Sequence, residues 1–236
     1  MEVSSESLVF SKSTTQTFHM PSEPAADLSG RRPLQSRSTA WARALSSWLT
    51  RQGVAPNAIS AASVGFSVLA VGVAWLAVRD VLPQGWAWLT LAVCVQLRLL
   101  CNLMDGMVAV EGGKKSPTGD LWNELPDRFA DAIFLLTAGW LSGAIFWAVA
   151  AGLGALMTAY VRALGHGLTR VQDFAGPGAK PQRMALLTLG ALVSVGGGRV
   201  SWAMPVTLML ITGLTWATVF LRMGRLARRM KNGGTA

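Results

Sequence analysis

The sequence has few of the residues that build sites in soluble enzymes. Its 236 residues include 2 Cys, 2 His and 1 Tyr, and only 14% are charged. Cys94 and Cys101 are seven positions apart, which is about 10 Å along a helix at 1.5 Å per residue and too far for a disulfide. No His or second Cys pair lies beside them, as a zinc site would need. Disulfide and zinc chemistry are therefore not expected.

What the chain has in abundance is apolar sequence. Hydrophobic residues make up 51% of it, with 10 Trp, and the mean hydropathy is positive, which is more apolar than a soluble domain tolerates. A bilayer core needs about 20 apolar residues per helix, and lipid leaves no backbone group unpaired. We therefore predict an all-α integral membrane protein of one helical domain. Its six transmembrane helices are placed at roughly 57–78, 85–109, 126–141, 143–165, 183–197 and 202–222.

The N-terminal region differs from the rest. Residues 1–30 are rich in Ser, Thr and Pro and have no apolar core behind a basic start, so they are predicted to be a disordered tail and not a secretory signal. The following "RRPLQSRSTAWARALSSWLTRQG" alternates Leu and Trp with Arg at helical period, which predicts an amphipathic interfacial helix on the membrane. An ordinary linker is the alternative. The membrane domain is expected at 31–230, followed by a tail at 231–236.

The net charge of +9 is explained by topology. With a cytoplasmic N-terminus, the Lys and Arg residues of the loops and ends lie on the cytoplasmic side, and only Arg79 and Arg199 lie outside. This asymmetry follows the positive-inside rule and suits contact with anionic lipid headgroups. No basic patch is interleaved with aromatic residues, so no nucleic-acid partner is expected.

Acidic residues gather between two apolar helices, in "CNLMDGMVAVEGGKKSPTGDLWNELPDRFAD" (101–131). Arg98, Asn102 and Asp105 share one helix face at the cytoplasmic interface. Ser116 is predicted to cap the next helix, with Pro117 at its first position. Pro126 is expected to kink or restart that helix.

Asp127 and Asp131 are one helical turn apart and are expected to face Asp105. A carboxylate near a bilayer is costly unless it is paired, hydrated or bound to a cation. Ligands that are all oxygen favour Mg²⁺ or Mn²⁺, and two such ions suit a pyrophosphate. The alternative is a solvated loop whose acids pair with nearby basic residues, namely Arg98, Lys114, Lys115 and Arg128.

These residues resemble the signature of the CDP-alcohol phosphatidyltransferases (class I). That signature runs Asp, two residues, Asp-Gly, two residues, Ala-Arg, a loop, Gly, three residues, Asp, three residues, Asp. "NLMDGMVA" matches it at Asp105, Gly106 and Ala109. Asn102 stands where the first Asp is expected, and Val110 replaces the Arg.

The second half of the signature aligns in two ways. With Gly119 as the signature glycine, Asn123 and Asp127 take the places of the last two acids. With "DRFAD" as the closing pair, these acids are Asp127 and Asp131, and the loop has four extra residues. We prefer the second alignment, because loops accept insertions at little cost and the chemistry requires carboxylates.

The resemblance covers about residues 31–230. "APNAIS" (55–60) resembles the segment that opens the family's first membrane helix, and "YVRALGHGL" with "GPGAKPQR" resembles its phosphate-handling region. The likeness is greatest to bacterial members that use CDP-diacylglycerol. It implies that Arg162, Lys180 and Arg183 bind phosphate, and that Gly106 and Ala109 line the substrate site.

The implied function belongs to phospholipid biosynthesis. A substituted phosphate group passes from a CDP-linked lipid to an alcohol, and CMP is released. If the donor is CDP-diacylglycerol, the transferred group is a phosphatidyl group. Two Mg²⁺ or Mn²⁺ ions would be held by acids of the signature and by Asn102 as a neutral ligand, with Glu111 or Glu124 as possible compensation for the missing carboxylate. The metal set is Asn102, Asp105, Asp127 and Asp131. Asp131 would accept the proton of the alcohol, or Asp127 would in the other alignment.

The resemblance also implies a homodimer in a bacterial cytoplasmic membrane, with the site on the cytoplasmic side and with membrane lipids as partners. Two other classes stay open. A transporter is less favoured, because its acids would lie near span midpoints. A catalytically inactive lipid-binding relative is kept open by Asn102.

Overall fold

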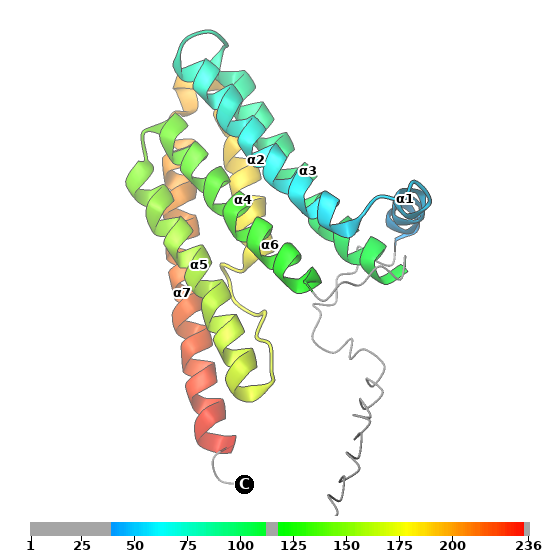
Figure 1. Cartoon of the computed structure of the whole chain (residues 1–236). Coiled ribbons are helices and arrows are strands. Elements are labelled where there is room, and N and C mark those ends of the chain that lie inside the picture. The colour runs from blue at the N-terminus through cyan, green and yellow to red at the C-terminus, as the bar shows by residue number, and fades with distance from the viewer. Residues whose placement is uncertain (1–38, 112–117, 234–236) are drawn as a thin grey trace, which may run out of the picture. The chain divides into compact units, whose positions relative to one another are not determined.

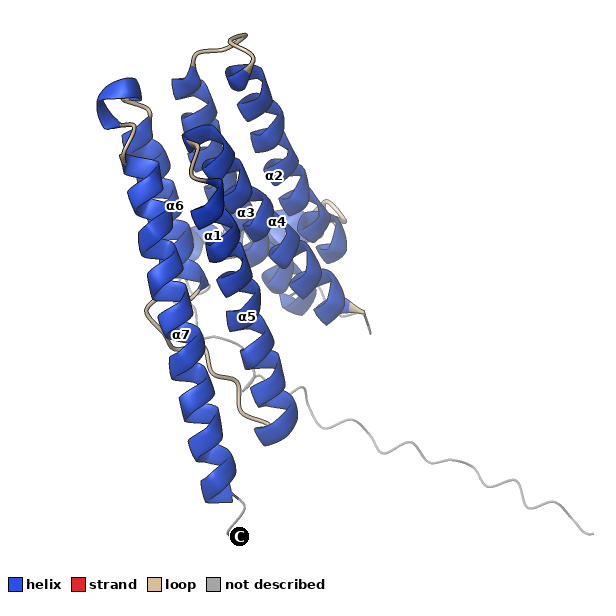
Figure 2. Ribbon diagram, turned by 90° about the vertical axis from the view of Figure 1, so that its left-hand side faces the viewer, coloured by secondary structure: helices blue, strands red, loops and turns tan. Residues whose placement is uncertain are grey.

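The computed structural model describes residues 39–111 and 118–233, and there it consists of helices joined by short loops (Figures 1 and 2). The predicted all-α class is confirmed for these residues. The tail predicted at 1–30, residues 234–236 of the tail predicted at 231–236, and Lys114, Lys115, Ser116 and Pro117 lie outside the described residues. Residues 231–233 of the predicted C-terminal tail belong instead to the last helix. The helices are α1 (Ala40–Arg51), α2 (Pro56–Val78), α3 (Gln84–Glu111), α4 (Gly119–Ser142), α5 (Ile145–Thr169), α6 (Lys180–Ser194), the 3₁₀ helix η3 (Gly197–Val200) and α7 (Ala203–Gly233).

Four segments of the described chain are long and apolar enough to cross a membrane, which makes the chain an integral membrane protein. They are Pro56–Val78, Gln84–Val110, Ile145–Thr169 and Gly197–Asn232. The remaining two predicted spans fall on α4 and α6. At 15 residues, α6 is shorter than the usual 20 or so, and α4 carries Asp127, Arg128 and Asp131 within its length.

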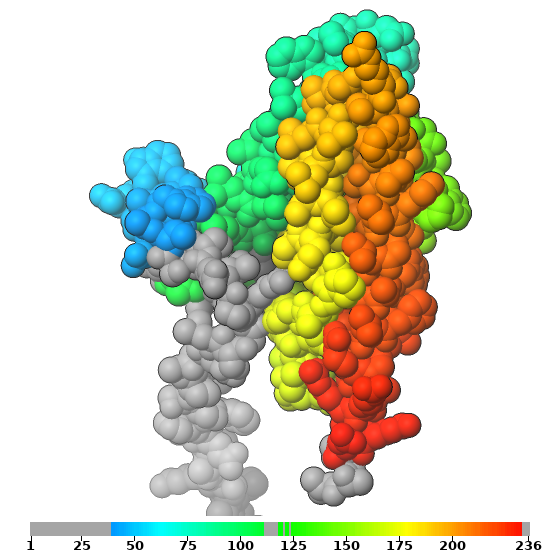
Figure 3. All heavy atoms as spheres, turned by 180° about the vertical axis from the view of Figure 1, so that it is seen from behind, coloured from blue at the N-terminus to red at the C-terminus, as the bar shows by residue number. Residues whose placement is uncertain are grey.

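Small residues let these helices pack closely. α2 packs against α3 and α4, α5 packs against α4 and α7, and α6 lies between α3 and α7 (Figure 3). A Cβ on Gly190 of α6 would lie 2.5 Å from Thr207 Oγ1 of α7, and one on Gly139 of α4 would lie 2.3 Å from the Cβ of Ala148 on α5. Glycine at these crossings allows the backbone approach that is typical of membrane helices.

α1 is turned across the direction of the longer helices, so that Figure 1 shows it nearly end-on. It packs against α3 through a small apolar cluster that includes Ala42, Ile59 and Met104. Trp41 and Trp48 of α1 are exposed. A helix is therefore present in this region at Ala40–Arg51, with apolar side chains both against α3 and on its exposed surface.

α4 runs without a break through Pro126, so the helix does not restart there as one reading of its sequence allowed. It ends at Ser142, and the following Gly143 has a left-handed φ of 71°. The amide of Ala144 then donates to the carbonyl of Gly139 at 2.9 Å, which closes the last turn. α4 thereby carries two of the predicted site acids on one continuous helix.

Candidate functional site

Three acids from two helices are buried at one end of the helix set. α3 supplies Asp105, and α4 supplies Asp127 and Asp131. These residues are 5%, 7% and 2% exposed. Asp105 and Asp127 lie near enough for their charges to interact. The structure therefore brings Asp105 of α3 near Asp127 of α4.

A fully buried arginine joins the two acids of α4. Arg98 Nη2 lies 2.8 Å from Asp127 Oδ1 and 2.5 Å from Asp131 Oδ1, and it donates to the backbone carbonyl of Asp127 at 2.8 Å. Arg98 is 0% exposed. The contact with Asp131 is an ion pair without hydrogen-bond alignment, because neither Asp131 oxygen has a hydrogen-bond donor among the described residues.

Two of the predicted phosphate ligands also contact these acids. Lys180, at the start of α6, donates a hydrogen bond to Asp127 Oδ2. Arg183 Nη2 lies 3.7 Å from Asp131 Oδ2, while its Nη1 donates to the carbonyl of Gly178 at 2.7 Å. The structure therefore brings Lys180 and Arg183 together with the acids of α4.

Asp105 has different partners. Ser60 of α2 donates its hydroxyl proton to Asp105 Oδ2 at 2.7 Å, and the Gly106 amide donates to Oδ1 at 2.6 Å. Of the three acids, Asp105 alone makes no ion pair within the described residues. Ser60 was not predicted as a site residue, although it closes the "APNAIS" segment that resembles the family.

Arg162, the third predicted phosphate ligand, faces Glu124. Glu124 Oε1 accepts from Arg162 Nη2 at 2.6 Å, and its Oε2 accepts from Arg128 Nη2 at 2.6 Å. Arg162 also lies over the ring of Phe174 at 5.3 Å. Burial raises the pKa of Glu124, but the two guanidinium groups outweigh it and hold that pKa below its usual range. Sequence reasoning found both residues but not their contact.

The loop between α5 and α6 is hydrogen-bonded to α7. This loop leads into α6 and so positions Lys180. Gly178 N donates to Thr218 Oγ1 at 2.8 Å. Arg222 Nε donates to the carbonyl of Ala175 at 3.1 Å. Arg225 Nε donates to Asp173 Oδ2 at 2.6 Å. These bonds hold the backbone that leads into α6.

The other predicted residues lie along the end of α3. Asn102, Gly106 and Ala109 are partly exposed there. The side chains of Glu111 and Asn123 lie outside the described residues, so the first alignment cannot be compared at Asn123.

The acids do not form a ready-made metal cluster in the described part of the chain. Within the described parts of the chain, no three His, Cys, Asp or Glu side chains are grouped closely enough to hold a metal. Asp127 and Asp131 already face cations of the chain. Among the described residues, Asp105 accepts hydrogen bonds from two neutral donors and makes no ion pair, which leaves its carboxylate suited to a hard cation.

No protein-family model matches the chain, and no curated protein matches its sequence significantly. Solved structures do match it. A phosphatidylinositol phosphate synthase (PgsA1) of Mycobacterium tuberculosis with CDP-DAG bound superposes with a TM-score of 0.65 at 19% identity, over 80% of this chain and 94% of that one. This chain has the fold of that synthase.

A second structure of the same synthase, in complex with manganese and citrate, gives a TM-score of 0.64 at 19% identity, over 78% of this chain and 88% of that one. The synthase is a CDP-alcohol phosphatidyltransferase. The likeness that the sequence motifs indicated is therefore confirmed at the level of the fold.

Proposed function

We propose that this protein transfers a substituted phosphate group from a CDP-linked lipid, with CDP-diacylglycerol favoured, to an alcohol, and releases CMP. The observation that carries the proposal is the buried cluster of Asp105, Asp127, Arg98, Lys180 and Arg183 in a fold shared with a synthase solved with CDP-DAG bound. A membrane enzyme needs such groups at the interface to hold a charged pyrophosphate beside lipid.

The chain's basic residues would hold the phosphate charges. Lys180 and Arg183 come from the start of α6 and already face carboxylates, which a phosphate could replace as their partner. Arg162 lies at the edge of the same region, held by Glu124. The partly exposed Gly106 and Ala109 leave room beside Asp105 for the nucleotide.

In the proposed reaction the alcohol oxygen forms a bond to the lipid-side phosphorus, and the bond from that phosphorus to the CMP oxygen breaks. The proton of the alcohol passes to a carboxylate. Burial favours Asp127 over Asp131 as that carboxylate, because Asp131 is 2% exposed and both its oxygens are shielded from solvent. Asp131 would instead hold Arg98 and Arg183 in place.

A divalent ion, when bound, would polarise the pyrophosphate and stabilise the leaving CMP. Support comes from the synthase structure solved with manganese and from the donor set at Asp105. Asp105 would hold the ion, with Asn102 one helical turn away as a neutral ligand. Ser60 and the Gly106 amide orient the Asp105 carboxylate, as supporting hydrogen bonds do for metal ligands.

We further propose six spans, with α4 and α6 completing the four long apolar segments, and α1 lying in the membrane interface. The site would lie on the cytoplasmic side of a bacterial inner membrane, and the protein would form a homodimer.

Single cysteines in place of Arg79 and Arg170, in a background without Cys94 and Cys101, test the topology. A membrane-impermeant thiol reagent added to intact cells should label position 79 only. Labelling of position 170 alone would reverse the topology.

The ion pairs of Asp127 and Asp131 favour a second candidate, a lipid-binding protein without catalysis. Carboxylates that are paired with Arg98 and Lys180 would have to leave these partners to take part in catalysis. This candidate predicts binding of CDP-diacylglycerol without turnover.

The deciding experiment incubates the purified protein with CDP-diacylglycerol, Mg²⁺ or Mn²⁺ and a panel of alcohols that includes inositol phosphate, glycerol phosphate and serine. CMP formation that needs both an alcohol and a metal would support the transferase. A Lys180→Gln variant should lose most of the activity, whereas a Lys231→Gln variant, altered at an exposed residue at the end of α7, should keep it. Lipid binding without CMP from any alcohol would favour the second candidate.

A further inference from the structure

Arg98 occupies a position where a positive charge is unusual. It lies on α3, is 0% exposed, and contacts the carboxylates of both Asp127 and Asp131. A buried guanidinium is costly unless it has partners. Here its partners are two acids that the sequence motif assigns to metal ions.

We infer that Arg98 is a built-in cation that takes the place of one of the two divalent ions expected from the sequence, so that each chain binds one Mg²⁺ or Mn²⁺. The inference rests on the proposed function for the kind of metal and substrate. In this view the positive charge of the site comes partly from one metal ion and partly from the side chain of Arg98.

Charge balance supports the inference. Three carboxylates, Asp105, Asp127 and Asp131, meet three cationic side chains, those of Arg98, Lys180 and Arg183. The described cluster is therefore close to neutral before any metal binds. Two divalent ions would add four positive charges, which the pyrophosphate of a substrate does not balance. One ion with a pyrophosphate leaves the region close to neutral.

The sequence change at Asn102 fits the same picture. Asn102 follows Arg98 by four residues, so both side chains lie on one face of α3. The resembling family has a carboxylate at this position. Loss of that carboxylate removes a metal ligand of full charge at the place where a guanidinium enters the cluster. Together the two features make the site two charges more positive than one with that carboxylate and without the arginine, which equals the charge of one divalent ion.

Asp105 is left as the site for the single ion. Its oxygens accept from Ser60 and from the Gly106 amide, and it makes no ion pair in the described part of the chain. Asp127 and Asp131, by contrast, are held by Arg98 from the side of α3 and by Lys180 and Arg183 from the side of α6. A second metal between them would have to displace a buried arginine.

The test counts bound metal. Full-length protein in lipid nanodiscs is titrated with Mn²⁺, and free Mn²⁺ is followed by electron paramagnetic resonance, with and without CDP-diacylglycerol. We expect one Mn²⁺ per chain in the presence of CDP-diacylglycerol. Two Mn²⁺ per wild-type chain would overturn the inference, and so would none. One bound Mn²⁺ without CMP formation would instead count against the proposed function and leave this inference intact.

Charge variants make the test specific. Arg98→Met removes the charge at similar length and should admit a second Mn²⁺, whereas Arg98→Lys keeps the charge and should stay at one. Arg128→Met is the matched control, because Arg128 pairs with Glu124 and not with Asp127 or Asp131, and its count should stay at one. A folded Arg98→Met protein that still binds one Mn²⁺ would contradict the proposal.

Asn102→Asp covers the case in which Arg98→Met does not fold. It adds a carboxylate beside the proposed ion while Arg98 remains, so the affinity for the single Mn²⁺ should rise about tenfold with no change in the count. A count of two in Asn102→Asp with Arg98 intact would show that Arg98 does not exclude the second ion.

Discussion

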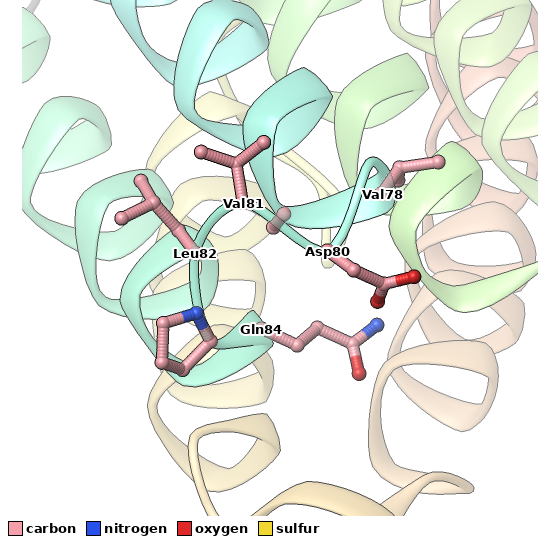
Figure 4. Close-up of a pocket in the computed structure, with 7 residues that line it drawn as sticks. Val78, Asp80, Val81, Leu82 and Gln84 are labelled. Carbon is pink, nitrogen blue, oxygen red and sulfur yellow. The ribbon is translucent and has the colours of Figure 1, made fainter.

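The two ends of α3 lie in very different surroundings. Near Asp105, buried charges from α3, α4 and α6 pair with one another. At Gln84, about 30 Å away at 1.5 Å per residue, the loop between α2 and α3 borders an open hollow (Figure 4). The hollow is lined by Ala77, Val78, Asp80, Val81, Leu82, Pro83 and Gln84. Asp80 makes no ion pair within the described residues.

The comparison shows that a hollow and a chemical site need not coincide. The loop end is open because its short turn leaves space, and its backbone reaches a φ of 58° at Asp80. At the charged end, the side chains of Arg98 and Arg183 are buried against the acids, and Lys180 contacts Asp127. A substrate phosphate would have to replace carboxylate partners there, so the site is defined by charge and not by concavity.

The largest expected effect separates the two ends by stability. Arg98→Ala leaves Asp127 and Asp131 buried without their main partner, and we expect the free energy of unfolding to fall by about 3–5 kcal/mol. Asp80→Ala at the loop end should change it by about 0.5 kcal/mol or less. Denaturant unfolding in detergent micelles measures both. Equal losses of unfolding free energy in the two variants would show that the charged end of α3 contributes no more to stability than the loop end.

The next prediction separates the two acids of α4. Asp127→Asn should slow CMP formation by about 10²-fold or more, because the alcohol loses its proton acceptor. Asp131→Asn should lose less turnover and should lower the melting temperature, because Arg98 and Arg183 lose a partner. If Asp131→Asn abolishes turnover with an unchanged melting temperature, the preferred sequence alignment is right and Asp131 is the base.

A smaller effect is expected from the loop that positions Lys180. A Cβ on Gly178 would lie 2.4 Å from the backbone nitrogen of Thr215, so Gly178→Ala must move the loop off α7. We expect a loss of about 1–3 kcal/mol in unfolding free energy and weaker binding of CDP-diacylglycerol. Gly167→Ala on α5 is the control, because its Cβ would meet nothing within 4 Å. Unchanged binding of CDP-diacylglycerol in Gly178→Ala would show that this loop does not position the residues that bind the lipid.

The smallest effect concerns pH. Burial raises the pKa of Asp173, but the hydrogen bonds from Arg225 and the Ala175 amide hold it below its ordinary value of 3.8. A carboxylate with a lowered pKa contributes stability above its unfolded value and loses it as the pH falls through the folded value. Below about pH 4 we therefore expect a modest drop in melting temperature that Asp173→Asn abolishes. An Asp173→Asn protein with the same acid sensitivity as wild type would assign the drop to other groups.

Much of this protein follows from local sequence. The apolar runs predict helices because lipid cannot satisfy an unpaired backbone, and each of the six predicted spans corresponds to a helix. The spacing of four residues between Asp127 and Asp131 predicts that they share one face of a helix. The spacing of seven residues between Arg98 and Asp105, about two helical turns, likewise puts these two side chains on one face.

Tertiary packing decided which charges meet. Lys180 is 53 residues from Asp127, and Glu124 is 38 residues from Arg162, so no helical period relates them. Their contacts depend on α6 lying beside α3 and on α5 lying beside α4. Glycines such as Gly190 and Gly139 permit that closeness. Spacing along one helix sets which side chains share a face, but only the packing of helix against helix determines what that face meets.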